Sequence, residues 1–163
     1  MKTIKNICSV AVALALVSVV AGCGGGPLRC DSPGSLDFEV TLTPDSVLAG
    51  TEVTVVASFE SAVFDNSEFF VQSEDVVIVD ASTDEWIGTF HNSRFNEGQG
   101  DPPIVSGVVL SGEVIDDRSI ELTLEFPNEL GQGAIVEMGA GNDDPHCSAS
   151  VFGEAPLAVD FVQ

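Results

Sequence analysis

The alternation of apolar and polar residues along three segments constrains the fold more than any other feature of the sequence. Residues 38–42, 53–59 and 120–126 carry an apolar side chain at every second position. Successive side chains of a β-strand point to opposite faces of its sheet, whereas a helical face recurs with a longer period. The three segments are therefore predicted to be strands with one face on an apolar core and the other in water.

Shorter segments that are rich in β-branched and aromatic residues are further strand candidates. They cover 69–71, 76–79, 86–90, 105–114, 135–138, 148–152 and 158–162. Stretches with Pro, Gly or Asp, such as 43–46 and 131–133, separate them and are typical of turns. No long amphipathic helix is evident. Short strands at nearly regular spacing predict an all-β, antiparallel β-sandwich with Greek-key connections. The continuous apolar runs 76–79 and 108–110 favour strands buried on both faces.

Residues 1–22 have the layout of an export signal. Lys2 and Lys5 precede an apolar run over 7–20, which small residues bring to an end. The run is about 14 residues long, whereas a membrane-spanning helix needs roughly 20. We therefore expect a cleaved signal peptide over 1–22, a Gly- and Pro-rich tether over 23–35 and one β-sandwich domain over 36–163.

The end of this signal, Val20-Ala21-Gly22-Cys23, resembles the lipobox of bacterial lipoproteins. The resemblance implies cleavage of the Gly22–Cys23 bond, a thioether-linked diacylglycerol on Cys23 and often a further acyl chain, such as palmitate, on the new amino terminus. It also implies the outer membrane, because Gly24 stands where an Asp retains many lipoproteins in the inner membrane. We thus expect a lipoprotein of the cell envelope that is held on a membrane by lipid.

Two cysteines remain once the signal and the anchor are accounted for. Cys8 leaves with the signal and Cys23 takes the lipid, so Cys30 and Cys147 are left. An even pair in an oxidising compartment predicts a disulfide between them. The bridge would close a loop over most of the domain, which is worth about 4–5 kcal/mol in the chain-entropy model. Two buried free thiols and a metal-binding pair are the alternatives.

The chain is strongly acidic. Its 26 Asp and Glu stand against 5 Lys and Arg, for a net charge of −21. Lys2 and Lys5 lie in the signal, so the mature protein is more acidic still. Such a surface repels nucleic acid and anionic headgroups, and we expect no nucleic-acid partner. The charge favours solubility, which leaves the lipid anchor as the expected link to the membrane.

No catalytic motif stands out in the sequence. It has two histidines, His91 and His146, no tyrosine, and neither a phosphate-binding glycine loop nor a Gly-x-Ser-x-Gly elbow. We therefore expect no enzyme and no cofactor. Calcium is the one ion to consider, because acidic loops supply the oxygen ligands that it prefers. Asp143 and Asp144, in a loop beside Cys147, are weak calcium candidates, and solvated loop charge is the simpler interpretation.

Two regions resemble immunoglobulin-like modules. The stretch from Leu42 to Val55 resembles the opening of many bacterial immunoglobulin-like modules, in which a Pro-led turn and a Gly precede an alternating strand. Residues 120–127 and 131–136 are similar to the later part of the transcription-factor-type immunoglobulin (IPT/TIG) family. The resemblance implies an immunoglobulin-like sandwich that serves binding or spacing rather than catalysis.

The sequence suggests where recognition would occur. Trp86 lies in an aromatic-rich middle region and is expected in the core, as in many sandwiches, with stacking on a sugar or peptide as the alternative. The long stretch 92–103 is the expected recognition loop. The predicted function is a non-catalytic envelope module that binds an envelope protein or polysaccharide, or has a structural role. The alternative is a calcium-dependent adhesin or ligand-binding lipoprotein.

Overall fold

The computed structural model describes residues 34–64, 71–93, 102–128, 133–142 and 149–161. These residues form eleven strands and no helix. The strands are β1 (Gly34–Asp37), β2 (Val40–Thr43), β3 (Ser46–Leu48), β4 (Glu52–Phe59), β5 (Ser73–Asp80), β6 (Trp86–Ser93), β7 (Ile104–Gly107), β8 (Val109–Val114), β9 (Ser119–Glu125), β10 (Ala134–Asn142) and β11 (Ala149–Asp160). Within this described part, no helix is long and apolar enough to cross a membrane.

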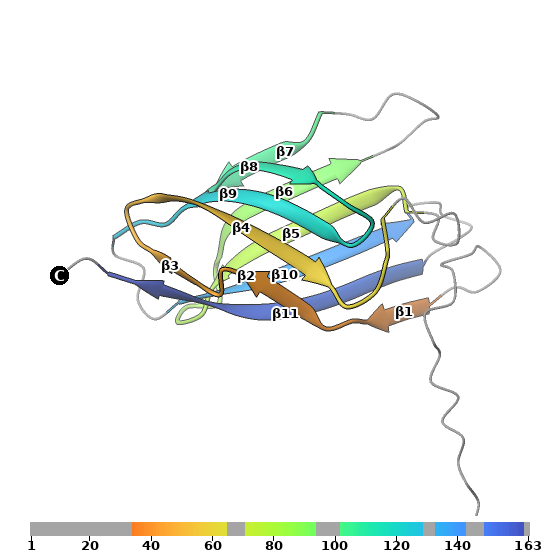
Figure 1. The fold of residues 1–163 in the computed structure, drawn as a ribbon, viewed down its shortest axis with the longest axis horizontal. Coiled ribbons are helices and arrows are strands. Elements are labelled where there is room, and N and C mark those ends of the chain that lie inside the picture. The colour runs from red at the N-terminus through yellow and green to blue at the C-terminus, as the bar shows by residue number, and fades with distance from the viewer. Residues whose placement is uncertain (1–33, 65–70, 94–101, 129–132, 143–148, 162–163) are drawn as a thin grey trace, which may run out of the picture.

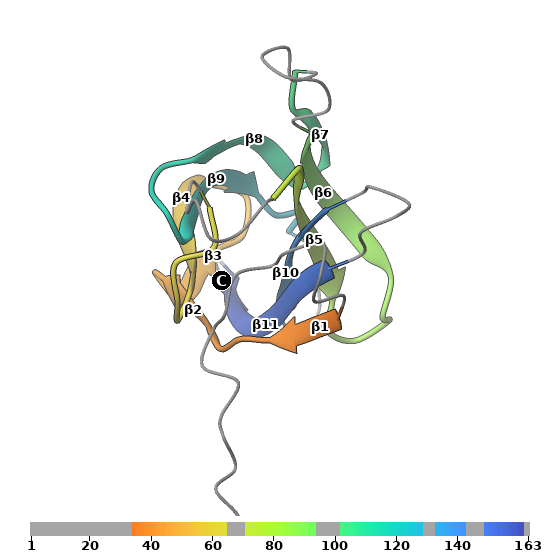
Figure 2. The ribbon, with the colours of Figure 1, turned by 90° about the vertical axis from the view of Figure 1, so that its right-hand side faces the viewer.

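The strands form two sheets that pack face to face (Figure 1, Figure 2). The larger sheet has the order β1-β11-β10-β5-β6-β7, with β3 also paired to β11, and the smaller sheet has the order β2-β4-β9-β8. The strands β1 and β3 run parallel to β11, and the other pairs are antiparallel. The predicted all-β sandwich is therefore confirmed.

The three alternating segments form most of the smaller sheet. They become β2, β4 and β9, and the register places Val55 opposite Leu122 and Ala57 opposite Ile120. All four side chains are fully buried. A shift of one residue between these strands would turn the whole apolar set toward water. The alternation seen in the sequence therefore decides which face of the sheet packs on the core.

Phenylalanine side chains fill the space between the sheets. Phe59, Phe64, Phe90 and Phe126 are each at most 1% exposed, and the Phe59 and Phe64 ring centroids lie 5.9 Å apart. Phe90, from the larger sheet, packs closely against β8 of the smaller one. A Cβ at Gly112 of β8 would lie only 2.4 Å from its ring. The absence of a side chain at Gly112 is thus what lets the two sheets meet there.

The segment 105–114, predicted as one strand, is divided between the two sheets. It breaks after Gly107, which has a φ of +67° and whose added Cβ would lie 1.9 Å from the Ile87 carbonyl oxygen. Only glycine fits a position with both constraints. The run 108–110 is not buried on both faces, because Leu110 is 42% exposed on the edge strand β8.

The segments 148–152 and 158–162, predicted as two strands, belong largely to the single strand β11. The Phe38 N–H donates to the Phe152 carbonyl (2.8 Å) on the β1 side of β11. By the alternation along a strand, Pro156 also directs its nitrogen to that side. No described strand pairs with β11 at Pro156 on that side, so its missing N–H removes no ladder hydrogen bond.

Short segments account for the remaining differences. Of 69–71, only Val71 is described, and it belongs to no strand. The strands β1 and β3 arise where a tether end and a turn were expected, and both are completed by distant pairing with β11. In the apolar run 76–79 of β5, Val76, Ile78 and Val79 are at most 2% exposed, whereas Val77 is half-buried, so burial on both faces is confirmed only in part.

Candidate functional site

The residues that the sequence singles out as sites all lie outside the described residues. They are Cys23 for lipidation, Cys30 and Cys147 for the disulfide, and Asp143 and Asp144 for calcium. Their roles therefore stay predictions. The strands that follow Cys30 and Cys147 in the chain are described.

The strands β1 and β11, which follow Cys30 and Cys147 in the chain, pair with each other. The strands run parallel, with Gly34 opposite Ala149. Cys30 precedes Gly34 by four residues, and Cys147 precedes Ala149 by two. Paired strands lie about 4.8 Å apart, and a disulfide joins Cα atoms about 4.4–6.8 Å apart. Both cysteines lie outside the described residues, so the bridge between them stays a prediction.

A row of side chains crosses the outer face of the larger sheet. In register order it consists of His91, Asp75, Gly139, Phe152 and Asp37, from β6, β5, β10, β11 and β1. The Phe152 ring covers the glycine, since a Cβ at Gly139 would lie 3.4 Å from a ring carbon. Residues from five strands thus meet at one level, and no local sequence pattern could have revealed this.

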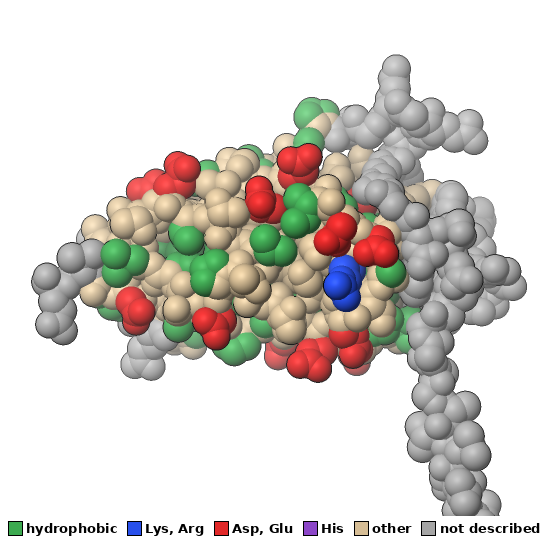
Figure 3. Space-filling view, in the orientation of Figure 1, with side chains coloured by type: hydrophobic (Ala, Val, Ile, Leu, Met, Phe, Trp, Pro, Cys, Tyr) green, Lys and Arg blue, Asp and Glu red, His purple; other side chains and the backbone are tan. Residues whose placement is uncertain are grey.

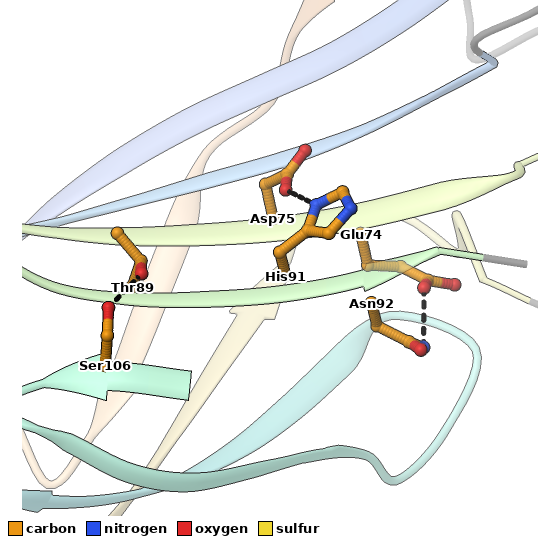
Figure 4. Close-up of polar contacts among 6 residues, drawn as sticks. All are labelled: Glu74, Asp75, Thr89, His91, Asn92 and Ser106. Atoms are coloured by element: carbon orange, nitrogen blue, oxygen red, sulfur yellow. Dashed lines mark hydrogen bonds and ion pairs between the residues drawn. The ribbon is translucent and has the colours of Figure 1, made fainter. Parts of the chain in front are cut away.

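The histidine of this row contacts a carboxylate. Figure 4 shows His91 Nδ1 against Asp75 Oδ1. The two side chains are 40% and 48% exposed, so water screens the contact and it contributes little to stability. One level along, the hydroxyls of Thr89 and Ser106 hydrogen-bond to each other (2.6 Å). These four side chains are thus engaged in two surface pairs.

A second polar contact between β5 and β6 lies on the inner face. Asn92 Nδ2 donates to Glu74 Oε2 (2.8 Å), as Figure 4 also shows. Glu74 is fully buried. A buried carboxylate is costly unless it accepts hydrogen bonds, so Asn92 is important for this arrangement. The sequence offered no signal for it, because Glu74 precedes the apolar run by which β5 was recognised.

Two acidic turns, at Asp80 and at Asp116, are ordered by their own hydrogen bonds. Asp80 Oδ1 accepts hydrogen bonds from the Ser82 hydroxyl (2.6 Å) and the Ser82 N–H (2.7 Å). The Ser82 bonds, side chain first, hold the pKa of Asp80 below its usual value. The Arg118 N–H donates to Asp116 Oδ1 (2.9 Å) and lowers the pKa of that carboxyl. Among the described residues, no group of three or more His, Cys, Asp or Glu is placed to hold a metal ion.

The turn at Asp80 predicts a pH-dependent effect on stability. The pKa of Asp80 is lowered in the folded protein from 3.8, so its charge stabilises the fold above that pH. This contribution disappears as the pH falls through the folded pKa. Asp80→Asn should therefore lower the melting temperature near neutral pH, and the difference from the unmodified protein should shrink in acid. Thermal melts across this range measure it, with Asp84→Asn as a control in the same turn. An equal difference at every pH would contradict the prediction.

The structure corrects the expected position of Trp86. We expected this side chain in the core, but it is 72% exposed. Trp86 opens β6 and pairs with Val79, where the β5–β6 register shifts. The shift lies at the end of the sandwich, and phenylalanine already fills the interior. The large apolar side chain of Trp86 is therefore exposed to solvent at the start of β6, which the sequence pattern did not predict.

A mostly apolar hollow lies where the chain crosses between the sheets. We call it the crossover hollow, and its volume is about 520 Å³. It is lined by Ile87, Gly107, Val108, Leu110, Glu125, Phe126 and Pro127. Glu125 is the single charged residue in this lining. Ile87 directly follows the exposed Trp86 in the sequence, so Trp86 is the chain neighbour of a residue that lines the crossover hollow.

A second hollow, of about 410 Å³, is acidic. It is lined by Asp37, Phe38, Glu137, Met138, Phe152, Gly153 and Glu154. Glu137 and Glu154 are direct cross-strand partners, and like charges in that position repel. Arg118 is the only Lys or Arg among the described residues. Figure 3 shows carboxylates spread over the face in view. The acidic character inferred from composition thus extends over the folded surface.

Comparison with known proteins adds no family to these observations. No protein-family model matches the chain, and no curated protein matches it.

Proposed function

We propose that the protein is a lipid-anchored, non-catalytic binding module of the bacterial cell envelope that engages a partner protein through Trp86. The export signal and the lipobox-like end of that signal support the anchor on Cys23 and a place on the outer membrane. The observation that carries the binding role is the exposure of Trp86, at 72% of its surface.

Trp86 is the most exposed of the large apolar side chains in the described part of the chain. Large apolar side chains are normally buried. Clusters of exposed apolar side chains mark interaction sites. Tryptophan is also among the residues that contribute most to binding energy at protein interfaces. The crossover hollow, lined by the neighbouring Ile87, adds a concave apolar surface into which a partner side chain can fit. These features favour a protein partner over a purely structural role.

The proposed module is immunoglobulin-like with Greek-key connections. Its support is the way the chain switches between sheets, from β4 to β5, from β7 to β8 and from β9 to β10. A sandwich of this kind keeps its core rigid while edges and loops carry recognition. A short tether after Cys23 would hold the domain close to the bilayer.

Site-specific photo-crosslinking in intact cells tests the proposed function. A benzophenone amino acid is placed at residue 86 and, as a matched control, at residue 152, where Phe152 is also a large exposed aromatic (51%) on the same sheet. We expect a discrete protein adduct from position 86 that is absent from position 152. The function is wrong if position 86 gives no protein adduct or the same adducts as position 152. Retention on cell-wall polysaccharide that is lost in Trp86→Ala would also overturn the protein partner.

A further inference from the structure

The strand β7 is an uncovered edge of the larger sheet. It pairs with β6, and no described strand pairs with its other side. All four of its residues are exposed, including Ile104 at 61% and Val105 at 38%. Figure 2 shows β7 at the rim of the sandwich, reaching beyond β8. The strand therefore presents both apolar side chains and a backbone edge to its surroundings.

The hydrogen-bond pattern shows which backbone groups face outward. The Val108 N–H donates to the Ile87 carbonyl (2.9 Å), just beyond the end of β7. In an antiparallel pair the bonding alternates, so Ile104 and Ser106 direct their backbone groups to β6. The N–H and C=O of Val105 then point away from the sheet. They are positioned to bond to a further strand.

The other sheet edges carry features that hinder strand addition. The edge strand β8 contains a register shift between Val109 and Ser111 and carries Glu113. The strand β2 is followed at once by Pro44. The edge of β11 is covered in part by β1 and β3, and Pro156 lies in the gap between them. Bulges, charges, prolines and covering strands are the usual means of protecting an edge. β7 has none of these within its four residues, and its prolines, Pro102 and Pro103, lie just before the strand begins.

The charge around β7 indicates what kind of segment would bind. Neither β6 nor β7 contains an Asp, Glu, Lys or Arg, in a chain with 26 acidic residues. Asp75 lies two strands away from β7, on β5, whereas Glu125 lies in the crossover hollow that Gly107 also lines. An incoming backbone would thus meet an uncharged edge with a negative charge near its Gly107 end. This arrangement is complementary to an apolar segment that also carries positive charge.

A second copy of this chain fits the edge poorly. Two copies would bring together net charges of −21 each, and their long-range repulsion opposes association. A contact along four residues is also far smaller than the roughly 1,200 Å² that stable interfaces bury. A flexible segment avoids both problems, because it can combine edge pairing with contacts elsewhere on the surface.

We propose that an extended, lysine- or arginine-containing segment of a partner protein adds to the free edge of β7 as an additional strand. The inference rests on the proposed binding function and specifies its mode. Backbone hydrogen bonds to Val105 supply affinity, apolar side chains of the segment pack on the face of β7 that carries Val105, and its basic side chains are attracted by the negative charge of the chain. The Gly107 end of the strand opens on the crossover hollow, which accepts one apolar side chain.

A synthetic peptide on the detergent-solubilised full-length lipoprotein tests the mode of binding. The probe is a short peptide in which valine alternates with lysine, and its twin carries glutamate in place of lysine. We expect the lysine peptide to slow hydrogen exchange of the Val105 amide by at least about tenfold and to bind at least about tenfold more tightly than its twin. Val105→Pro removes the outward N–H and should weaken binding by a similar factor, since that N–H makes no bond within the sheet.

A pair of lysine substitutions keeps the test decisive if the proline variant does not fold. Val105→Lys places a repelling charge on β7, and Leu48→Lys places the same charge on β3, where Leu48 has a similar exposure of 41%. Only the first should weaken the lysine peptide. Unchanged Val105 exchange, no peptide binding, or equal loss in both lysine variants would overturn strand addition. A Trp86 crosslink to a protein in cells, found alongside that negative result, would leave the binding function standing without this mode.

Discussion

Cys23→Ser is expected to abolish incorporation of labelled palmitate into the protein and to remove its lipid anchor. The thiol of Cys23 is the predicted attachment point for diacylglycerol, and a serine hydroxyl is a much weaker nucleophile near neutral pH. Each methylene of a lipid chain that is buried in the bilayer contributes about 0.8 kcal/mol to membrane binding. Stable anchoring needs two lipid chains. Loss of the lipid should therefore change the mature chain from membrane-bound to unbound.

The acidic surface makes this effect close to complete. With a net charge of −21, the chain has no electrostatic attraction to anionic headgroups that could replace the lipid. We therefore expect no residual retention of the processed protein on washed membranes.

Cys8→Ser is the matched control for the anchor. Cys8 lies within the predicted signal, so its replacement should leave both the palmitate label and membrane retention intact. Mass spectrometry of the amino-terminal peptide should find the mature chain beginning at a diacylated Cys23. Persistence of the label in Cys23→Ser, or a mature chain that begins elsewhere, would refute the lipoprotein assignment.

The sequence predicted the strands whose alternation is reinforced by their neighbours. In the smaller sheet, Val55 and Leu122 each lie on an alternating segment and face each other across the strand pair. Local patterning and tertiary contact agree there, which makes the assignment secure. The sequence did not predict the elements whose boundaries depend on tertiary contacts alone. Gly107 ends β7 because of the Ile87 carbonyl, and β1 and β3 exist because β11 offers them an edge.

The candidate binding surface was harder to predict than the fold. Trp86 was expected inside because large aromatic residues usually are, yet the β5–β6 register shift places it on the surface. The outward backbone of Val105 depends on the phase of the β6–β7 ladder, which no local pattern encodes. The row from His91 to Asp37 likewise depends on the order of five strands. Each of these features is non-local, so only the folded chain displays it.

Removing the predicted disulfide is the second large effect that we expect. Cys147→Ser should lower the free energy of unfolding by about 4 kcal/mol, because the bridge to Cys30 closes a loop over most of the domain. Domains of this size have about 5–15 kcal/mol of stability in total, so much of it would be lost. At about 3 °C per kcal/mol, the melting temperature should fall by roughly 10–15 °C.

The parallel β1–β11 pair explains why the loss should be concentrated at one edge. Gly34 pairs with Ala149, and β1 contains only four residues, so few hydrogen bonds hold it to β11. A bridge between Cys30 and Cys147, just before both strands, would keep β1 in register. Without the bridge, β1 is expected to detach before the rest of the sandwich unfolds, because short peripheral strands open at low cost. As the protein is destabilised, the hydrogen-exchange rate of the β1 amides should then rise under milder conditions than the rate of the β4 and β9 amides.

Cys30→Ser and the double variant complete the test of the bridge. If the two thiols are joined, either single variant and the double variant should show the same loss of stability, since each removes the same bond. Reduction of the unmodified protein should reproduce that loss, and it should not affect the double variant. Two alkylatable thiols in the unreduced protein would show that no bridge exists. In that case β1 would depend on its four-residue pairing with β11 alone, and the two substitutions would have independent, small effects.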